Sequence, residues 1–321
     1  MARFLRSATT CCALLALGAG CGVNLSPRFP ADSPLYVEVV DETRQIIQGA
    51  QFGEEGMEIG FGNTVGFVQR PTADGSVALE ITRRAASITH PTLGKLEFDS
   101  AADGDHGDKS LADMNRPWVG KSLVVSKGPD QLSTEIDGFD ELQAAMEESA
   151  AGDMIYEQTK SNYTADTLRR TLFDNRFVPL PPASVTVGQS WSRSFETKFP
   201  RLGRVTFQYD CTLDKIENPE GTRLAVIKYR AKGVFSGEPA AESATGQRPV
   251  LRSMDTDGTI MFDLELGQPI AQDAQFTTVV NLVGPGENAE PTNTVTAKSA
   301  VHVTAVPLTE HVARHARETS D

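Results

Sequence analysis

The chain has 321 residues, of which 39% are hydrophobic and 23% charged. That balance supplies enough apolar surface for a large core, so we expect a globular protein rather than a disordered one. The formal net charge of −13 argues against nucleic acid as a partner and against electrostatic binding to anionic membranes, because like charges repel.

The first twenty residues have the three parts of a secretory signal. Arg3 and Arg6 make the start basic, and residues 13–17 (ALLAL) are apolar. Small residues at 18–20 then stand just before a cysteine. The apolar stretch is shorter than the roughly 20 residues that a bilayer-spanning helix needs, so we expect a signal and not a membrane anchor.

Residues 17–21 (LGAGC) resemble the lipobox of bacterial lipoproteins, whose cysteine receives a diacylglycerol before the signal is cleaved. The leucine stands four residues before the cysteine, where three is commoner. We expect cleavage to remove residues 1–20, Cys21 to carry the lipid, and residues 21–33 to form an irregular tether. Each buried methylene of such a lipid contributes ~0.8 kcal/mol to membrane binding. The alternative is an ordinary secretory signal in which this cysteine is incidental.

The residue after that cysteine bears on which membrane holds the protein. Gly22 stands there instead of an aspartate, which favours the outer membrane in an envelope with two membranes. The expected location is therefore the cell envelope, with the exported protein anchored by lipid on the periplasmic face of the outer membrane.

From residue 34 onward, alternating apolar and polar residues predict antiparallel strands with one buried and one wet face. Turn signals such as Asp74-Gly75 and Asp257-Gly258 separate the alternating runs. We count ten to twelve strands on this basis. The clearest runs are 77–82, 205–213, 260–266 and 295–304.

Cys211 belongs to the apolar face of the run 205–213. We expect it in the core, where a free cysteine behaves as a small hydrophobe, and not as a reactive thiol. If Cys21 is acylated, no second thiol is left in the exported chain to form an intramolecular disulfide.

Helical spacing appears in the middle of the chain. Asp137 is placed to cap a helix that runs to about Ala150, and a second helix is expected at about 165–173. The proline-rich segment 179–182 (PLPP) ends the helical region and precedes the next strands.

These patterns predict an α+β protein dominated by antiparallel strands, with a short helical insert near the middle. The β-rich domain spans 34–306, with halves at about 34–136 and 184–306 around an insert at about 137–175. The strands form either one large curved sheet or two similar halves, and short sequence echoes between the halves leave a duplication open. Residues 307–321 are a polar tail, either a frayed helix or disordered.

Five short segments occur in a consistent order along residues 40–305. They are 96–100 (LEFDS), 118–121 (WVGK), 136–142 (IDGFDEL), 187–191 (VGQSW) and 258–263 (GTIMFD). In this order they resemble an uncharacterised family of bacterial lipoproteins, DUF6263. The resemblance implies a lipoprotein rich in strands, and it implies no activity, cofactor or site residue.

An acidic run after residue 98 is the best candidate for a metal site. Its weak candidate ligands are Asp99, Asp103, Asp105 and Asp108, and Gly104 lies among them. Oxygen ligands at alternate positions around a glycine suit calcium. The run departs from an EF-hand loop because Ala101 occupies a ligand position and Ser110 stands where a glutamate is required. We prefer the competing interpretation, a solvated loop between two strands, and expect no cofactor.

Other candidate catalytic patterns are incomplete. His311 and His315 are spaced to share a helix face, but no glutamate follows the first, as a zinc protease motif requires. Residues 188–192 (GQSWS) lack the second glycine of a nucleophile elbow. The sequence therefore nominates no catalytic residue.

The leading functional hypothesis is a non-enzymatic binding module for a lipid, another apolar ligand or a partner protein. It rests on a fold-level analogy with the half-barrels of periplasmic lipoprotein carriers, in which helices cover a concave apolar sheet. The apolar residues of the two predicted helices would form a lid, with plain core packing as the alternative. They are Phe139, Leu142, Met146, Leu168 and Leu172. The competing functions are an envelope assembly protein with no small ligand and an enzyme with a dispersed site.

Overall fold

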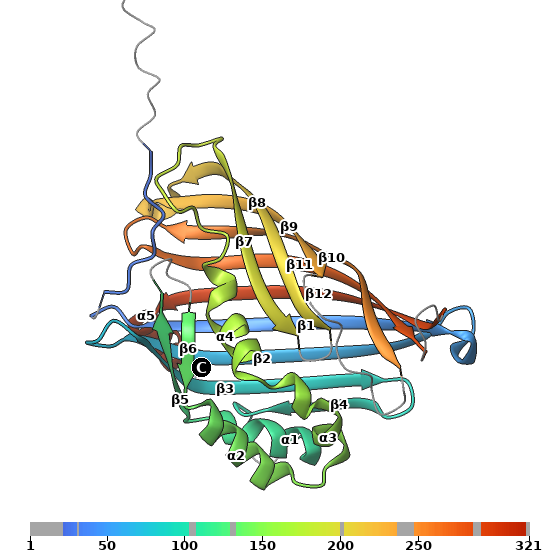
Figure 1. Ribbon diagram of the computed structural model, residues 1–321. Helices are drawn as coiled ribbons and strands as arrows, with labels where there is room; N and C mark the ends of the chain where they lie inside the picture. The colour runs from blue at the N-terminus through green and yellow to red at the C-terminus, as the bar shows by residue number, and fades with distance from the viewer. Residues whose placement is uncertain are drawn as a thin grey trace, which may run out of the picture.

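Twelve antiparallel strands form one open sheet in the computed structural model (Figure 1). The structure describes residues 22–30, 32–102, 107–128, 133–199, 202–235, 247–284 and 290–318. The strands are β1 (Leu35–Gly49), β2 (Met57–Pro71), β3 (Val77–His90), β4 (Gly94–Asp99), β5 (Ser122–Lys127), β6 (Ser133–Asp137), β7 (Ser190–Phe199), β8 (Gly203–Glu217), β9 (Leu224–Phe235), β10 (Arg248–Asp263), β11 (Gln268–Val283) and β12 (Pro291–Pro307). The prediction of an α+β protein dominated by antiparallel strands is confirmed.

The strand order is β6-β5-β3-β2-β1-β12-β11-β10-β9-β8-β7, with β4 paired to β3 outside this path. The chain thus starts at the centre of the sheet, runs outward through β1–β6, and crosses to the opposite edge through the helical insert. It then returns through β7–β12 to the centre, where β12 pairs with β1 along its whole length, from Leu35↔Pro307 to Gly49↔Asn293. One continuous sheet therefore contains both β-rich stretches of the sequence.

The two faces of the sheet differ in what covers them. Side chains alternate along each strand, so Val37 and Val39 of β1 point to the face on which the helices pack, whereas Glu38 points away. We call the helix-covered side the inner face and the opposite side the outer face. Figure 1 shows the helices lying over one end of the long strands, while the other ends of β1, β2 and β12 extend past them.

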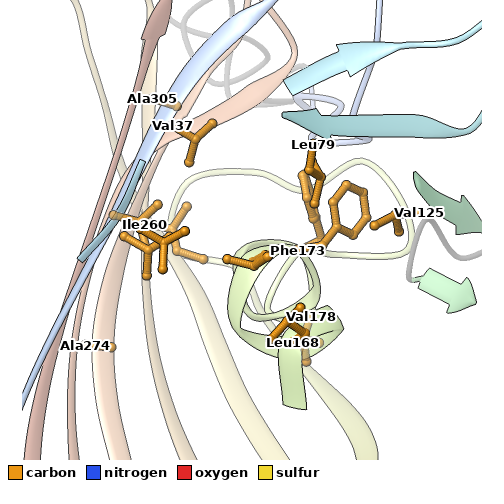
Figure 2. Close-up of a cluster of buried hydrophobic side chains, with 14 of the residues drawn as sticks. Val37, Leu79, Val125, Leu168, Phe173, Val178, Ile260, Ala274 and Ala305 are labelled. Carbon is orange, nitrogen blue, oxygen red and sulfur yellow. The ribbon is translucent and has the colours of Figure 1, made fainter. Parts of the chain in front are cut away.

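The main core lies between the inner face and the helical insert (Figure 2). The sheet contributes Val37, Leu79 and Ile260, and the insert contributes Phe173, all of them fully buried. Complete burial of an aliphatic or aromatic side chain stabilises a fold by roughly 1.5–3 kcal/mol, so this cluster holds the insert against the sheet.

The helical insert has four α-helices among the described residues: α1 (Lys109–Asn115) lies between β4 and β5, and α2 (Phe139–Ala150), α3 (Met154–Thr159) and α4 (Ala165–Leu172) lie between β6 and β7. The two predicted helices correspond to α2 and α4, but helical structure begins earlier than expected, at α1. The expected cap of α2 was wrong. Asp137 is the last residue of β6, paired with Val124, and the N-cap is Gly138 at φ 84°. A Cβ at Gly138 would lie 2.8 Å from the Ser122 carbonyl oxygen, so glycine is required there.

The described residues before β1 (22–30 and 32–34), which belong to the segment expected to be an irregular tether, are irregular in backbone and pack against the domain. Leu25 is fully buried in the main core, and Val23 forms a β-bridge with Val185. The Arg28 guanidinium donates hydrogen bonds to the Leu264 and Glu265 carbonyl oxygens at 2.7 and 2.6 Å. The chain is therefore fastened to the domain from its first described residues.

The last described element is α5 (Leu308–Glu318), so the described part of the tail is helical. The helix packs next to β1, where the His311 ring stacks on Tyr36 with 3.5 Å between ring centroids. No helix within the described ranges is both long and apolar enough to cross a membrane.

Candidate ligand-binding face

The five proposed lid residues pack onto the main core. Leu142, Met146, Leu168 and Leu172 are all at most 5% exposed, and Phe139 is half-buried against the same core. Their burial is what plain core packing produces, and it closes the end of the inner face that the helices cover. Any open part of that face must lie elsewhere.

The inner face continues past the helices as a second, apolar surface. At its far end one ladder of paired residues crosses five strands in the order Met57, Ile47, Val295, Val280 and Leu251. Two further ladders lie between this row and the core, and they mix apolar with polar residues: Ile59–Gln45–Ala297–Thr278 and Phe61–Thr43–Ser299–Phe276. We define the distal apolar face as Ile47, Met57, Ile59, Phe61, Leu251, Phe276, Val280, Val295 and Ala297.

Every side chain of the distal apolar face is half-buried, in contrast to the fully buried inner-face residues under the helices. Leu251 and Phe276 touch the main core, and the other seven lie outside both buried clusters of the described residues. Contiguous apolar surface without packing partners is uncommon on soluble proteins and marks ligand or partner sites. This surface is the strongest candidate for a functional site.

A short polar strip of Asp41, Thr43 and Ser299 lies on the inner face between the core and the outermost ladder, and its Thr43 and Ser299 share a ladder with Phe61 and Phe276. Asp41 of β1 lies opposite Val301 and Asn63. It accepts a hydrogen bond from the Thr43 hydroxyl at 3.1 Å, and Thr43 lies 2.6 Å from the Ser299 hydroxyl. Burial raises the pKa of the Asp41 carboxyl, and the Thr43 hydrogen bond offsets only part of that effect.

An arginine that the sequence analysis missed is buried between the insert and the sheet. Arg176 is 1% exposed, donates to the Gln69 side-chain oxygen and lies over the Phe177 ring. Its Nε and Nη1 atoms have no hydrogen-bond partner among the described residues. Burial lowers the pKa of its guanidinium to about 9. No sequence pattern distinguishes this arginine from a surface one, because its burial depends on a remote strand.

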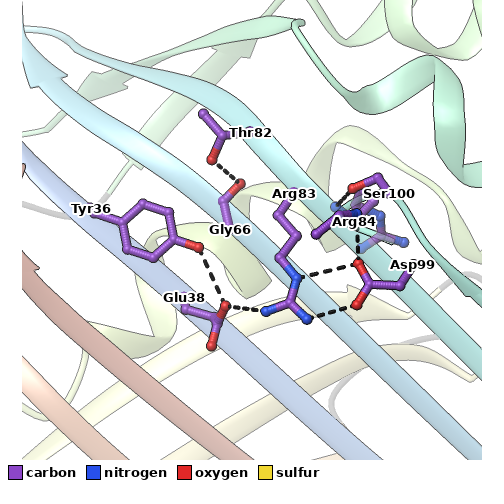
Figure 3. Close-up of polar contacts among 9 residues, drawn as sticks. Tyr36, Glu38, Gly66, Thr82, Arg83, Arg84, Asp99 and Ser100 are labelled. Atoms are coloured by element: carbon purple, nitrogen blue, oxygen red, sulfur yellow. Dashed lines mark hydrogen bonds and ion pairs between the residues drawn. The ribbon is translucent and has the colours of Figure 1, made fainter. Parts of the chain in front are cut away.

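The outer face carries a charged network where Arg83 links two carboxylates (Figure 3). Its guanidinium contacts Glu38 at 2.9 Å and Asp99 at 2.8 Å, and the Tyr36 hydroxyl donates to Glu38 at 3.3 Å. Burial and the neighbouring Glu38 raise the pKa of Tyr36 to about 12, and Arg83 holds the pKa of Asp99 below its usual range. Asp99 is thus an ion-pair partner of Arg83.

The other candidate metal ligands fall in two groups. Asp108 is the N-cap of α1, accepting a hydrogen bond from the Leu111 amide at 3.1 Å. Asp103 and Asp105 lie outside the described residues, as does Cys21. No cluster of three or more His, Cys, Asp or Glu side chains in the described ranges is placed to hold a metal ion.

An open hollow of about 1030 Å³ lies on the outer face and is lined by residues of β7–β12, among them Asp210, Lys228 and His302. Within it, Lys228 forms an ion pair with Asp214 at 3.1 Å, and the His302 ring lies 2.6 Å from the Asp273 carboxylate. Among the described residues, no hydroxyl or thiol forms a hydrogen bond with His302 that would complete a catalytic triad.

Cys211 faces the opposite way, into the core, as expected. Its burial raises the pKa of the thiol to about 12, which makes it a poor nucleophile.

Comparisons with known proteins add little. No protein-family model and no curated protein matches the chain. Among solved structures, a lipovitellin described for its lipid–protein interactions aligns with 87% of this chain at 8% identity and a TM-score of 0.43. This chain spans about a quarter (25%) of that chain. Salmonella typhi OmpF in complex with daunomycin and Pseudomonas aeruginosa OpdQ align at 10% and 9% identity, covering 86% and 87% of this chain and 99% of each of theirs, both with TM-scores of 0.22. Similarity this low supports no functional argument, and the resemblance to the DUF6263 family stays a prediction.

Proposed function

We propose that this protein is a lipid-anchored component of the bacterial envelope that binds a lipid or another apolar ligand on its distal apolar face. The observation that carries the proposal is the continuation of the apolar inner face beyond the helices, where seven apolar side chains lack packing partners in the core clusters. Binding sites for apolar ligands are concave surfaces lined mainly by such side chains. On the distal apolar face these side chains come from five neighbouring strands of one sheet, β2, β1, β12, β11 and β10.

The anchor and the binding face belong to opposite ends of the long strands. The N-terminal segment packs near the turn between β10 and β11, where the Arg28 amide donates to the Gly267 carbonyl oxygen at 2.8 Å. The distal apolar face lies at the far end of β1, whose 15 residues span about 45–50 Å. With lipid on Cys21, the binding face would lie at the strand ends remote from the anchor. The proposed protein therefore exchanges its ligand with a soluble carrier or with the opposite membrane.

Export, lipidation of Cys21 and attachment to the periplasmic face of the outer membrane are parts of the same proposal. Their support is the signal-like N-terminus and the LGAGC segment. Membership in the DUF6263 lipoproteins is proposed on the ordered motifs of the sequence.

Native mass spectrometry tests the binding function. The chain is produced from residue 21 with Cys21→Ser, is exposed to envelope extract and is sprayed without denaturation. We expect an added mass of lipid size that is lost on unfolding. Ala297→Lys, which places a charge on the distal apolar face, should abolish the added mass. Its neighbour variant Thr296→Lys lies on the outer face of the same strand and should retain it.

A polypeptide mass with no adduct under all conditions would contradict the proposal. The assembly-protein alternative would then predict capture of a protein partner that depends on Ala297 and not on Thr296. Loss of the added mass in both Ala297→Lys and Thr296→Lys would show that the lipid binds at another place on the protein.

A further inference from the structure

The position of Asp41 gives the distal apolar face a chemical preference. On the inner face of β1, Val39 before it is 2% exposed and belongs to the core, whereas Thr43, Gln45 and Ile47 after it lead onto the distal apolar face. Asp41 is therefore an acidic group at the boundary between packed and unpacked apolar surface on β1.

No cation in the described part of the chain forms an ion pair with this carboxylate. Its ladder neighbours Val301 and Asn63 are uncharged, and none of the described Lys, Arg or His side chains forms an ion pair with it. Arg84 lies on the inner face of the neighbouring part of β3, but its guanidinium is directed into the insert. There it donates a hydrogen bond to the Asn115 side-chain oxygen and lies 4.4 Å from the centroid of the Trp118 ring.

A partly desolvated carboxylate beside an apolar surface attracts a cationic or hydrogen-bond-donating head group and repels an anionic one. The only donor bonded to it among the described residues is the neutral Thr43 hydroxyl. The carboxylate therefore keeps acceptor capacity for a ligand, since an ionised carboxylate offers about four lone-pair sites.

We propose that the distal apolar face selects amphiphiles with a primary amine. The ammonium group of such a ligand pairs with Asp41, and its alkyl chain lies along β1 toward Ile47. This inference rests on the proposed function and names its ligand class. Ile47 lies six residues beyond Asp41, roughly 20 Å along the strand, which is enough for a long alkyl chain. The Thr43 and Ser299 hydroxyls of the polar strip contact the part of the ligand next to the head group.

A matched series of single-chain ligands tests the inference. The protein is produced from residue 21 with Cys21→Ser and is loaded with a neutral pyrenyl alkane as a fluorescent probe. Hexadecylamine, hexadecanol and palmitic acid, each below its aggregation limit, are then compared for their ability to displace the probe. We expect the amine to bind about tenfold more tightly than the alcohol, and the acid more weakly than either. Asp41→Asn should reduce the amine-to-alcohol ratio to about one and leave the affinity for the alcohol unchanged.

Glu42→Gln is the control, because it removes an adjacent carboxylate on the outer face of the same strand. It should keep the full preference for the amine. Equal affinities for all three ligands, or an amine preference that survives Asp41→Asn, would overturn the inference and leave the proposed function intact. Failure of every ligand and of the pyrenyl probe to bind would overturn both. Sedimentation showing a dimer that Ala297→Lys disrupts would assign the face to a second copy of the chain, and would also overturn both.

Discussion

Val23 and Val185 are joined by two backbone hydrogen bonds, from the Val23 amide to the Val185 carbonyl at 2.8 Å and in return at 3.0 Å. Two segments about 160 residues apart in sequence are thus held together at the end of the sheet where the chain enters. This relationship makes the N-terminal segment part of the folded domain, with consequences for stability.

Truncation of Leu25 should destabilise the whole domain. Its side chain is fully buried in the main core, so Leu25→Ala removes apolar contacts and leaves a cavity. We expect the free energy of unfolding in urea to fall by about 2–5 kcal/mol. Ser26→Ala, at an exposed neighbouring position, should change it by less than about 0.5 kcal/mol. Equal stability of the wild type and Leu25→Ala would show that the segment is a free tether after all.

The pH dependence of stability should report on Asp41. Burial raises the pKa of this carboxyl above 3.8, so the folded state holds its proton more tightly than the unfolded state does. The resulting stabilisation is fully present below pH 3.8 and is lost as the pH rises through the raised pKa. Without ligand, Asp41→Asn should therefore be more stable than the wild type at pH 7, and the difference should shrink toward pH 4.

Urea unfolding at a series of pH values measures that difference, with Glu42→Gln as the control for loss of one negative charge. A variant that is less stable than the wild type at pH 7 would mean that the Asp41 carboxylate makes a favourable charged contact in the folded protein.

Cys211 should resist thiol reagents in the native state. It is 1% exposed, and burial raises the pKa of its thiol to about 12, so both access and ionisation are unfavourable. In the chain with Cys21→Ser, a chromogenic disulfide reagent should react slowly in buffer and within the mixing time in urea. Rapid stoichiometric reaction in buffer would place the thiol at the surface.

Most of the sheet could be predicted from the sequence, because half-buried strands repeat with period two along runs such as 205–213. The helices α2 and α4 were predictable for the same kind of reason, with apolar residues at helical spacing. By contrast, α1 and α3 have seven and six residues, too few for a periodic signal. The aspartate that caps α1, Asp108, looks the same in sequence as a metal ligand.

The candidate site was harder to predict. Phe61 and Phe67 both lie on the inner face of β2, and alternation treats them alike, yet Phe67 is fully buried and Phe61 is half-buried. The difference comes from how far the helices reach over the sheet, which depends on contacts between remote segments. For the same reason Leu25, in a proline-rich stretch, gave no sign that it belongs to the core.

The buried Arg176 provides a further test of how the insert is held. Its guanidinium bonds Gln69, and two of its nitrogen atoms lack partners among the described residues, so its burial is unfavourable in itself. Gln69→Leu removes the bonded acceptor and should lower the free energy of unfolding by about 1–3 kcal/mol.

The double variant Arg176→Met with Gln69→Leu replaces both groups by apolar side chains of similar size. It should be at least as stable as the wild type, since an apolar replacement of a buried charge is commonly neutral or stabilising. Urea unfolding of the three proteins decides the matter. A double variant less stable than Gln69→Leu alone would mean that the Arg176 guanidinium, with its contact to Phe177, stabilises the insert more than an apolar side chain does.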